Sequence, residues 1–558
     1  MAEVGAPLLR IEDLTVALPS WADRPHAVED LSLTIYPDEI LCVVGESGSG
    51  KSVTARAILR LLPEPHVRPV GGRILFEGEN LLQATQARMR QVRGGRIAMI
   101  FQEPMTALNP VMKIGRQIEE MVEIHLDMSA AARRQRILDL LRDVHLPDPE
   151  RLLATYPHEL SGGQRQRAMI AMALVLEPAI LVADEPTTAL DVTTQAQILA
   201  LIKELQKKHH TGVLFITHDF GVVAEIADRV AVMQHGRLVE LGAAAQVLDA
   251  PRHPYTQALV AAVPSLVPRS ARPATDEPVL LRATNVDKAF GSGRLTLTRR
   301  STGRYVHAVK SVGLAVRRGR TLGLVGESGS GKSTLARCIV RLMDPDGGEI
   351  WLGDTELSTL SRRQLRPHRK RIQMIFQDPY GSLNPRLTVA QIVAQGPIVH
   401  GVPEREALSA ARDLLELVGL DPRGADRFAH EFSGGQRQRI GIARALALKP
   451  EVLIADEPVS ALDVSVQAQV LELLADIRDR FHLTMLFITH DLRVAAQVCD
   501  DIAVMRYGEI VEEGPTAEVF AKPGHPYTQE LLAAVPGRHW ISPISAAVAE
   551  PPHPAPRA

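Results

Sequence analysis

The sequence predicts an α/β fold made of two tandem domains, and two observations support this prediction. First, one ordered set of motifs occurs twice along the 558 residues, with offsets of 272 to 281 residues between the copies. A repeat of this length indicates whole domains, because solenoid repeats are only about 20–50 residues long. Second, the motifs follow short apolar runs such as 41–44 and 321–325, which suit strands buried on both faces of a parallel sheet.

The two motif sets appear in the same order. They read GESGSGKS at 45–52 and 326–333, FQ(E/D)P at 101–104 and 376–379, and (L/F)SGGQ at 160–164 and 432–436. They continue with ADEP at 183–186 and 455–458, ALD at 189–191 and 461–463, and THD at 217–219 and 489–491. Several of these motifs end an apolar run, and open α/β sheets bind ligands at the carboxyl ends of their strands.

The glycine-rich loops are predicted to bind phosphate groups. Glycine lets the backbone N–H groups of a loop converge, and the helix that follows presents its positive N-terminus. The lysine would reach the β- and γ-phosphates, and the serine after it would coordinate Mg²⁺. One such loop can be a chance glycine-rich turn, but two copies followed by acidic strand ends are not. The loop residues are Gly45, Ser47, Gly48, Gly50, Lys51 and Ser52 in the first copy and Gly326, Ser328, Gly329, Gly331, Lys332 and Ser333 in the second.

An acidic pair ends a later apolar run in each copy. Asp184 and Asp456 would hold Mg²⁺ directly or through water. Glu185 and Glu457 would polarise the attacking water. Taken alone, such a pair is equally compatible with a solvated strand end, so the assignment depends on the motifs around it.

Two further polar positions complete each set. His218 and His490 would contact the γ-phosphate and sense its loss. Gln102 and Gln377 would help to position Mg²⁺ and water, and would report the nucleotide state to whatever contacts the helical subdomain. Outside this context, a histidine after a strand is more often structural.

The Ser-Gly-Gly segments are expected to have two compatible roles. Ser161 and Ser433 are good N-caps for the helices predicted after them. Gly163 and Gly435 leave room for a phosphate to approach the helix start.

Composition and periodicity predict the domain boundaries. We expect domain one over 1–264, a proline-bearing linker over 265–279, domain two over 280–537 and a disordered tail over 538–558. Between the glutamine and Ser-Gly-Gly motifs, apolar residues recur at helical spacing, which predicts a helical subdomain in each copy. These residues are Ile137, Leu138, Leu140, Leu141 and Val144, then Leu414, Leu415, Leu417 and Val418.

Composition favours a cytosolic, reduced protein. The formal net charge of −2 gives no overall attraction to nucleic acid or to anionic membranes. No apolar stretch approaches the roughly 20 residues that span a bilayer, and the N-terminus lacks the pattern of a secretory signal. The three scattered cysteines, Cys42, Cys338 and Cys499, suggest neither a disulfide framework nor a metal cluster.

Together these motifs resemble the ATP-binding cassette (ABC) family over essentially both halves of the chain. The resemblance implies an ATPase that binds ATP and Mg²⁺. Each domain would have a mainly parallel core sheet, an antiparallel β subdomain and a helical signature subdomain. The two domains would face each other head to tail as an intramolecular cassette dimer and sandwich two ATP molecules.

The resemblance also implies how the residues combine across the two domains. Asp191 and Asp463 match the loop that links the sites, and two hydrolytically competent sites are expected because neither copy has lost its glutamate or signature. Site one would combine Lys51, Ser52, Gln102, Asp184, Glu185 and His218 with Ser433 and Gly435, and site two would combine Lys332, Ser333, Gln377, Asp456, Glu457 and His490 with Ser161 and Gly163.

A His-Pro-Tyr-Thr segment follows each copy, at 253–256 and 525–528. From its residues alone, this segment is a proline-initiated helix without chemistry. Its recurrence is similar to the C-terminal extension of peptide and nickel importer ATPases, as are the segments at 99–110 and 156–160. Within that group, a single chain with two fused cassettes is most similar to the ATP-binding subunits of glutathione importers. Related fused subunits serve dipeptides, oligopeptides and peptide antibiotics.

The chain departs from this group at two points. Many members carry a cysteine cluster after the His-Pro-Tyr-Thr segment; this chain has none, so no iron–sulfur cluster is expected. The family stacks adenine on an aromatic residue before the phosphate loop. Phe290 matches that position in copy two, whereas copy one has Leu18, with Trp21 nearby as a candidate substitute.

Two classes of function remain open. The leading one is the ATPase subunit of an importer, peripheral on the cytoplasmic face of the inner membrane. Its partners would be two transmembrane permease subunits and an extracytoplasmic substrate-binding protein. Glutathione or di- and oligopeptides are the expected substrates, with a nickel chelate or a peptide antibiotic as alternatives. The other class is a soluble tandem-cassette translation factor on the ribosome, but those factors have a long charged helical linker and no role for the His-Pro-Tyr-Thr segments.

Overall fold

The computed structural model describes residues 6–102, 107–188, 190–270, 272, 276–291, 306–460 and 462–540. The chain forms two compact units, the first made of Met1–Val263 with Val535–Ala558 and the second of Pro264–Ala534. The chain thus passes from one unit to the other at the start of the expected linker. Most of the expected tail, 541–558, lies outside the described residues.

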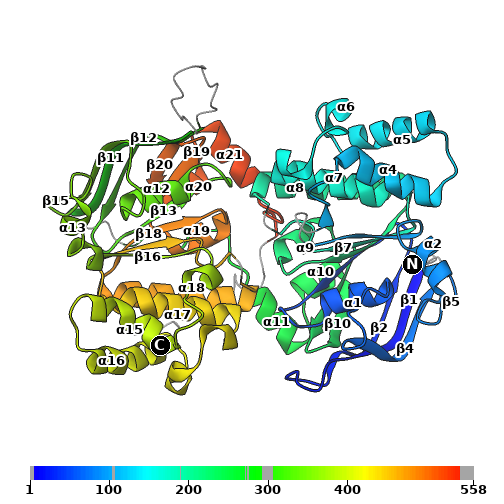
Figure 1. Cartoon of the computed structure of the whole chain (residues 1–558), viewed down its shortest axis with the longest axis horizontal. Coiled ribbons are helices and arrows are strands. Elements are labelled where there is room, and N and C mark those ends of the chain that lie inside the picture. The colour runs from blue at the N-terminus through cyan, green and yellow to red at the C-terminus, as the bar shows by residue number, and fades with distance from the viewer. Residues whose placement is uncertain are drawn as a thin grey trace, which may run out of the picture. The chain divides into compact units, whose positions relative to one another are not determined.

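Unit one contains an antiparallel sheet and a larger, mainly parallel core sheet (Figure 1). The antiparallel sheet has the order β2-β1-β4-β5, with β1 Leu9–Ala17, β2 His26–Ile35, β4 Arg68–Phe76 and β5 Glu79–Asn80. The core sheet has the order β10-β9-β3-β8-β7-β6, and β10 pairs antiparallel with β9 while the other pairs run parallel. Its strands are β3 Ile40–Val44, β6 Ile97–Ile100, β7 Ile180–Asp184, β8 Gly212–Ile216, β9 Arg229–Gln234 and β10 Arg237–Ala243.

Helices surround these sheets, and α4, α5 and α7 lie together as a helical layer in Figure 1. The helical periodicity predicted between the glutamine and Ser-Gly-Gly motifs is confirmed by α5. The helices of unit one are α1 Lys51–Ile58, α2 Gln86–Val92, α4 Ile114–His125, α5 Ala130–Asp143, α6 Pro149–Leu152, η1 Pro157–Glu159, α7 Gly162–Leu174, α8 Val192–His209, α9 Phe220–Ile226, α10 Ala244–Asp249 and α11 Pro254–Ala261.

Unit two repeats both sheets. Its antiparallel sheet has the order β12-β11-β14-β15, and its core sheet the order β16-β17-β18-β13-β19-β20. The antiparallel strands are β11 Val279–Phe290, β12 Val306–Arg317, β14 Gly347–Leu352 and β15 Thr355–Glu356. The core strands are β13 Thr321–Val325, β16 Ile372–Ile375, β17 Val452–Asp456, β18 Thr484–Thr489, β19 Asp501–Arg506 and β20 Glu509–Pro515.

The helices of unit two follow the same order, and α16 confirms the second periodic segment. They are α12 Lys332–Ile339, α13 Arg362–Leu365, η2 His368–Lys370, α14 Pro379–Ser382, α15 Val389–Val399, α16 Glu404–Leu417, η3 Pro422–Asp426, η4 Ala429–Glu431, α17 Gly434–Leu446, α18 Val464–Phe481, α19 Leu492–Val498, α20 Thr516–Ala521 and α21 Pro526–Ala533.

The central strands are buried along their whole length, as their continuous apolar sequence predicts. Every residue of β3, β7 and β8 is buried, and the same holds for β13, β17 and β18. In unit one, the main core cluster joins the antiparallel sheet, the first helix and one face of the core sheet through residues such as Ile11, Ile58 and Val182. This packing fixes the carboxyl ends of the core strands, where the polar motifs lie.

The three cysteines are all buried and unbridged. Among the described residues, no helix combines the length and apolarity needed to cross a bilayer.

Candidate functional site

The glycine-rich loop of unit one needs glycine for two different reasons. Gly45 and Gly50 have φ angles of 147° and 104°, and a Cβ atom would lie 2.2 Å from the carbonyl oxygen of Met233 and 2.6 Å from that of Ala27, respectively. Gly48 has a φ of 77°, which favours glycine, although a Cβ there would meet nothing within 4 Å. Unit two repeats this geometry at Gly326, Gly329 and Gly331.

The loop lysines begin the following helices and fold back into the loop. The Nζ of Lys51 donates to the carbonyl oxygens of Gly45 at 2.7 Å and Glu46 at 2.9 Å, and the residue is 6% exposed. The Nζ of Lys332 makes the equivalent bonds at 2.7 and 2.8 Å. Each ammonium group is therefore held against the backbone of its own loop.

The serine after each lysine contacts the aspartate that ends a core strand. The Ser52 hydroxyl donates to Asp184 at 2.8 Å, and the Ser333 hydroxyl donates to Asp456 at 2.9 Å. Both aspartates are 1% exposed, and burial raises the pKa of each carboxyl. Each site thus has a buried carboxylate beside a hydroxyl.

The glutamate after each aspartate collects the remaining motif residues. Glu185 has a positive φ of 47°, and its carboxylate accepts a hydrogen bond from the amide of Gln102 at 3.0 Å. The Nδ1 of His218 lies 3.4 Å from the same carboxylate. In unit two, Gln377 and His490 contact Glu457 at 2.8 and 3.2 Å, and its φ is 46°. The structure therefore brings together, within each unit, the lysine, serine, aspartate, glutamate, glutamine and histidine that the sequence predicted.

The histidines contribute most to lowering the pKa of these glutamates. Burial alone would raise the pKa of Glu185, but the hydrogen bond and charge of His218 outweigh it and lower that pKa below its usual value. The same balance with His490 lowers the pKa of Glu457. Conversely, burial would lower the pKa of His490, and Glu457 raises it above its usual value. Both glutamates are therefore ionised at neutral pH.

The Ser-Gly-Gly segments cap helices as predicted. Ser161 and Gln164 form a capping box at the start of α7, and Ser433 and Gln436 form one at the start of α17. The second glycine has a packing role that the sequence did not reveal. A Cβ on Gly163 would lie 2.7 Å from Thr194, and one on Gly435 would lie 2.3 Å from Val466.

The remaining predicted residues lie as follows. Asp191 caps α8 and accepts a hydrogen bond from the Thr194 N–H at 2.8 Å, and Asp463 occupies the N-cap position of α18. The combination of each loop with the Ser-Gly-Gly segment of the other unit stays a prediction.

The adenine contacts also stay predictions. Phe290 ends β11 and is 42% exposed, whereas Trp21 is 74% exposed and meets the ring of His66 edge-on at 5.6 Å between centroids. The N–H of Leu18 bonds to the carbonyl of Pro25, which closes the loop that carries Trp21.

Two kinds of contact at the phosphate loops have no signal in the sequence. The guanidinium group of Arg24 donates to the carbonyl oxygen of Gly48. The hydroxyl groups of Tyr255 and Tyr527, from the His-Pro-Tyr-Thr segments, each accept a hydrogen bond from a loop N–H. Each of these contacts joins residues far apart in sequence or on an irregular loop, where spacing carries no information.

Comparison with known protein families gives two matches. A model described as ABC transporter matches residues 28–188 and 309–460. A second model, described as the C-terminal region of oligopeptide/dipeptide transporters, matches residues 239–291 and 511–548. The second model covers both His-Pro-Tyr-Thr segments.

Curated relatives match nearly the whole chain. It is 49% identical over 533 residues to the peptidoglycan transport ATP-binding protein YejF of Agrobacterium fabrum, which covers 95% of this chain and 96% of the relative. It is 49% identical over 559 residues to the glutathione import ATP-binding protein GsiA of Escherichia coli O6:H1, with 95% and 89% covered. Among solved structures, the ATP-binding cassette MJ0796 in a dimeric post-hydrolysis state with ADP and Pi covers 42% of this chain and 98% of its own, with 30% identity and a TM-score of 0.38.

The family model spans more than half of the chain, and the relatives named here extend the match to nearly all of it. The chain therefore belongs to the ABC transporter family and is an ATPase with two tandem nucleotide-binding cassettes, each followed by the C-terminal region of oligopeptide/dipeptide transporters.

Proposed function

We propose that the chain is the ATPase subunit of an importer of small peptides, peripheral on the cytoplasmic face of the inner membrane. The observation that carries this proposal is the full-length match to relatives named for glutathione import and peptidoglycan transport. Glutathione is a tripeptide and peptidoglycan carries short peptide stems, so small peptides are the substrate class common to both names. Glutathione and di- or oligopeptides are the first candidates, with a nickel chelate or a peptide antibiotic as alternatives.

The proposed reaction assigns one role to each side chain of a site. Glu185 and Glu457, kept ionised, orient the attacking water and take up its proton. His218 and His490 hold these carboxylates from one side and face the γ-phosphate. Lys51 would exchange its bonds to the loop carbonyls for phosphate oxygens, and Lys332 would do the same.

The donor atoms present in each unit fit Mg²⁺. Ser52 Oγ and Asp184 Oδ1 lie 2.8 Å apart, with the amide of Gln102 on the neighbouring glutamate. Mg²⁺ usually takes one or two carboxylates together with phosphates and waters, so a single buried aspartate is sufficient. Among the described residues no cluster of three or more His, Cys, Asp or Glu side chains is placed to hold a metal. When bound, Mg²⁺ neutralises charge on the β- and γ-phosphates. Ser333, Asp456 and Gln377 would hold it in unit two.

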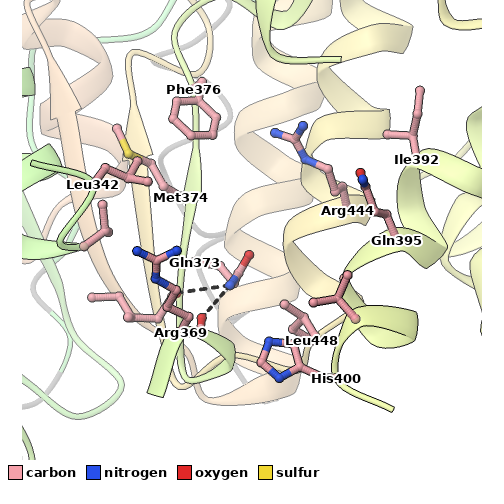
Figure 2. Close-up of a pocket in the computed structure, with 14 residues that line it drawn as sticks. Leu342, Arg369, Gln373, Met374, Phe376, Ile392, Gln395, His400, Arg444 and Leu448 are labelled. Carbon is pink, nitrogen blue, oxygen red and sulfur yellow. Dashed lines mark hydrogen bonds between the residues drawn. The ribbon is translucent and has the colours of Figure 1, made fainter. Parts of the chain in front are cut away.

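A groove on unit two supports coupling to a permease subunit. It encloses about 330 Å³ between β16, α15 and α17, and Figure 2 shows Phe376, Ile392 and Arg444 around it. Leu342 and Val399 also line it and are 56% and 54% exposed. Phe376 lines the groove and directly precedes Gln377, which contacts Glu457. A change at the γ-phosphate that moves Gln377 would therefore also move a residue of the groove. We assign the groove to a cytoplasmic helix of one permease subunit.

The charges in this groove differ from those at the equivalent positions of unit one. Arg369 and Arg444 line the groove, and each donates to a backbone carbonyl oxygen and not to a carboxylate among the described residues. Burial lowers the pKa of Arg444 below its usual value. The equivalent positions in unit one are Gly94 and Met172. The permease helix at unit two would therefore present a carboxylate, and the two permease subunits would not be interchangeable.

Affinity purification tests the proposal. The tagged chain is extracted from membranes in mild detergent, and the proteins that co-purify are identified by mass spectrometry. Two permease subunits support the importer. Ribosomal proteins without a permease would replace it with a translation factor. The binding protein encoded with the permeases is then titrated with glutathione and with short peptides.

The charge assignment has a separate test. Arg369→Glu should reduce recovery of one permease subunit at least about tenfold and leave the other bound, because truncated charge pairs at interfaces cost about 2–5 kcal/mol. The control in unit one is the same charge reversal at an exposed helical position, Arg90→Glu, which should not affect that same subunit. Equal recovery with both variants would remove the charge assignment while leaving the importer proposal in place.

A further inference from the structure

The His-Pro-Tyr-Thr segment of each unit contacts the phosphate loop of the same unit. The backbone N–H of Glu46 donates to the Tyr255 hydroxyl at 3.1 Å, across 209 positions of sequence. In unit two, the N–H of Glu327 donates to the Tyr527 hydroxyl at the same 3.1 Å. Two independent copies thus make the same contact between a C-terminal tyrosine and the second residue of the loop.

The residue that the tyrosine holds is the one that positions the loop lysine. Glu46 donates its N–H to Tyr255, while its carbonyl oxygen accepts from the Nζ of Lys51 at 2.9 Å. The equivalent Glu327 is held by Tyr527 and accepts from Lys332 at 2.8 Å. Movement of the tyrosine therefore changes the backbone that holds the lysine.

The tyrosine is itself held rigidly in unit one. The Nδ1 of His253 accepts from the Tyr255 N–H at 3.2 Å and caps α11. The carboxylate of Glu240, on β10, accepts from the N–H groups of Arg252 at 2.8 Å and His253 at 3.1 Å. The start of the helix is thus fixed to the core sheet.

Unit two repeats this support. His525 accepts from the Tyr527 N–H at 3.1 Å, and Glu512 accepts from the His525 N–H at 3.1 Å. Tyr527 is 1% exposed, and burial raises its pKa to about 12. The hydroxyl is therefore neutral at any physiological pH, and its hydrogen bond does not depend on titration. Arg506 lies over the same ring at 4.4 Å.

We propose that Tyr255 and Tyr527 are positioning residues for the nucleotide phosphates, which act by holding the loop backbone that presents Lys51 and Lys332. The C-terminal segment is in this way part of each ATP site. This assignment concerns ATP binding alone and does not depend on the transported substrate.

Tyr→Phe variants of the full chain test the proposal, because they keep the ring and remove only the hydroxyl. The probe is 8-azido-ATP. Photolabelling across a concentration series, followed by peptide mass mapping, gives a half-saturation concentration for each unit separately. Tyr36→Phe is the matched control in unit one, since the Tyr36 ring packs against Arg229 at 5.6 Å and its hydroxyl makes no hydrogen bond in the described part of the chain.

Tyr255→Phe should raise the half-saturation concentration of unit one about three- to tenfold, the range of one lost hydrogen bond, and leave unit two within about twofold. Tyr527→Phe should do the reverse. In steady-state ATPase assays, each variant should raise KM more than it lowers kcat.

A purely structural tyrosine gives a different result. In that case Tyr255→Phe lowers the melting temperature, but the half-saturation concentration of unit one equals that of the Tyr36→Phe control. That result would show that the proposal is wrong. Equal loss of labelling in both units would also overturn it, because it would indicate general unfolding and not a local effect on one loop.

Discussion

At the scale of single residues, the charge of the glutamate at each site is set by its neighbours. Glu185 and Glu457 are largely buried, which raises the pKa of each carboxyl. The histidine beside each one, helped by the loop lysine, outweighs that effect and lowers the pKa. A carboxylate that is ionised and held by an amide and an imidazole is suited to orient water and accept its proton.

Replacing these glutamates tests whether both sites hydrolyse ATP. Glu185→Gln and Glu457→Gln should each lower the steady-state ATPase rate by about half or more, and the double variant by at least about 100-fold, the usual contribution of a general base. Release of phosphate measures the rate, and photolabelling with 8-azido-ATP confirms that binding is retained. An unchanged rate in Glu185→Gln would show that site one is inert.

The pairing of His490 with Glu457 predicts a pH dependence. Since the pKa of His490 is raised in the folded protein, the pair's stabilisation is fully present below about pH 6.5 and is lost as the pH rises through the folded pKa. Histidine-selective NMR, assigned with His490→Gln, should give a midpoint above about 6.5. The midpoint should fall in Glu457→Gln. A parent midpoint below 6.5 would contradict the pairing.

At the scale of helices and strands, the sequence predicted those elements that a local pattern of apolar residues specifies. The buried strands β3, β7, β8 and their copies are continuous apolar runs, and their ends carry the site residues as expected. The antiparallel sheets were expected only from family resemblance, although the burial of β1 alternates along part of the strand as a half-buried strand should.

Contacts between distant segments were not predictable from spacing. The bond from Glu46 to Tyr255 depends on how α11 returns to the core sheet, and no periodicity reports that path. The positive φ of Glu185 was equally hidden, because glutamate is not a residue type that signals a left-handed turn.

Gly434 and Gly435, the two glycines of the second Ser-Gly-Gly segment, should differ in how well they tolerate replacement by alanine. Gly435→Ala places a Cβ 2.3 Å from Val466, a stiff β-branched neighbour on α18, and should destabilise unit two by about 1–3 kcal/mol. At Gly434 a Cβ meets nothing within 4 Å, so Gly434→Ala should stay within about 1 kcal/mol of the parent. Scanning calorimetry measures both variants. Similar melting temperatures for the two would contradict this packing role.

At the scale of the whole molecule, the residues that follow each His-Pro-Tyr-Thr helix are hydrogen-bonded to a helix, α19 in one copy and α9 in the other. In unit two, the side-chain amide of Gln497 donates to the carbonyl oxygens of Ser265 and Val267, both at 2.8 Å, and the Arg269 N–H bonds to Ala496. In unit one, the N–H of Gly537 donates to Glu225 at 3.2 Å. Gly537 lies 272 residues after Ser265, and Gln497 lies 272 residues after Glu225. The two copies therefore follow the same path.

Among the residues that follow the first His-Pro-Tyr-Thr helix, Arg272 makes the strongest contacts with unit two. Its guanidinium group pairs with Asp500, which is 6% exposed, and also donates to the carbonyl oxygen of Gly319 at 3.1 Å. Burial alone would raise the pKa of Asp500, but Arg272 and the N–H of Thr321 lower it, so the pair persists until the pH falls through that lowered value. Residues 264–270 and Arg272 therefore belong to unit two and are not a free tether.

Arg272→Ala should release this segment. Removing the guanidinium group leaves a buried carboxylate with fewer partners, at a cost of about 1–3 kcal/mol once the partial exposure of Arg272 is considered. Amide hydrogen exchange in peptides covering 264–270 should accelerate at least about fivefold. Arg269→Ala is the matched control, because it removes the same charge from the segment while the bond that Arg269 makes to Ala496 uses only the backbone. If both variants exchange at the rate of the parent, the bonds from Gln497 hold the segment, and Arg272 is not its anchor.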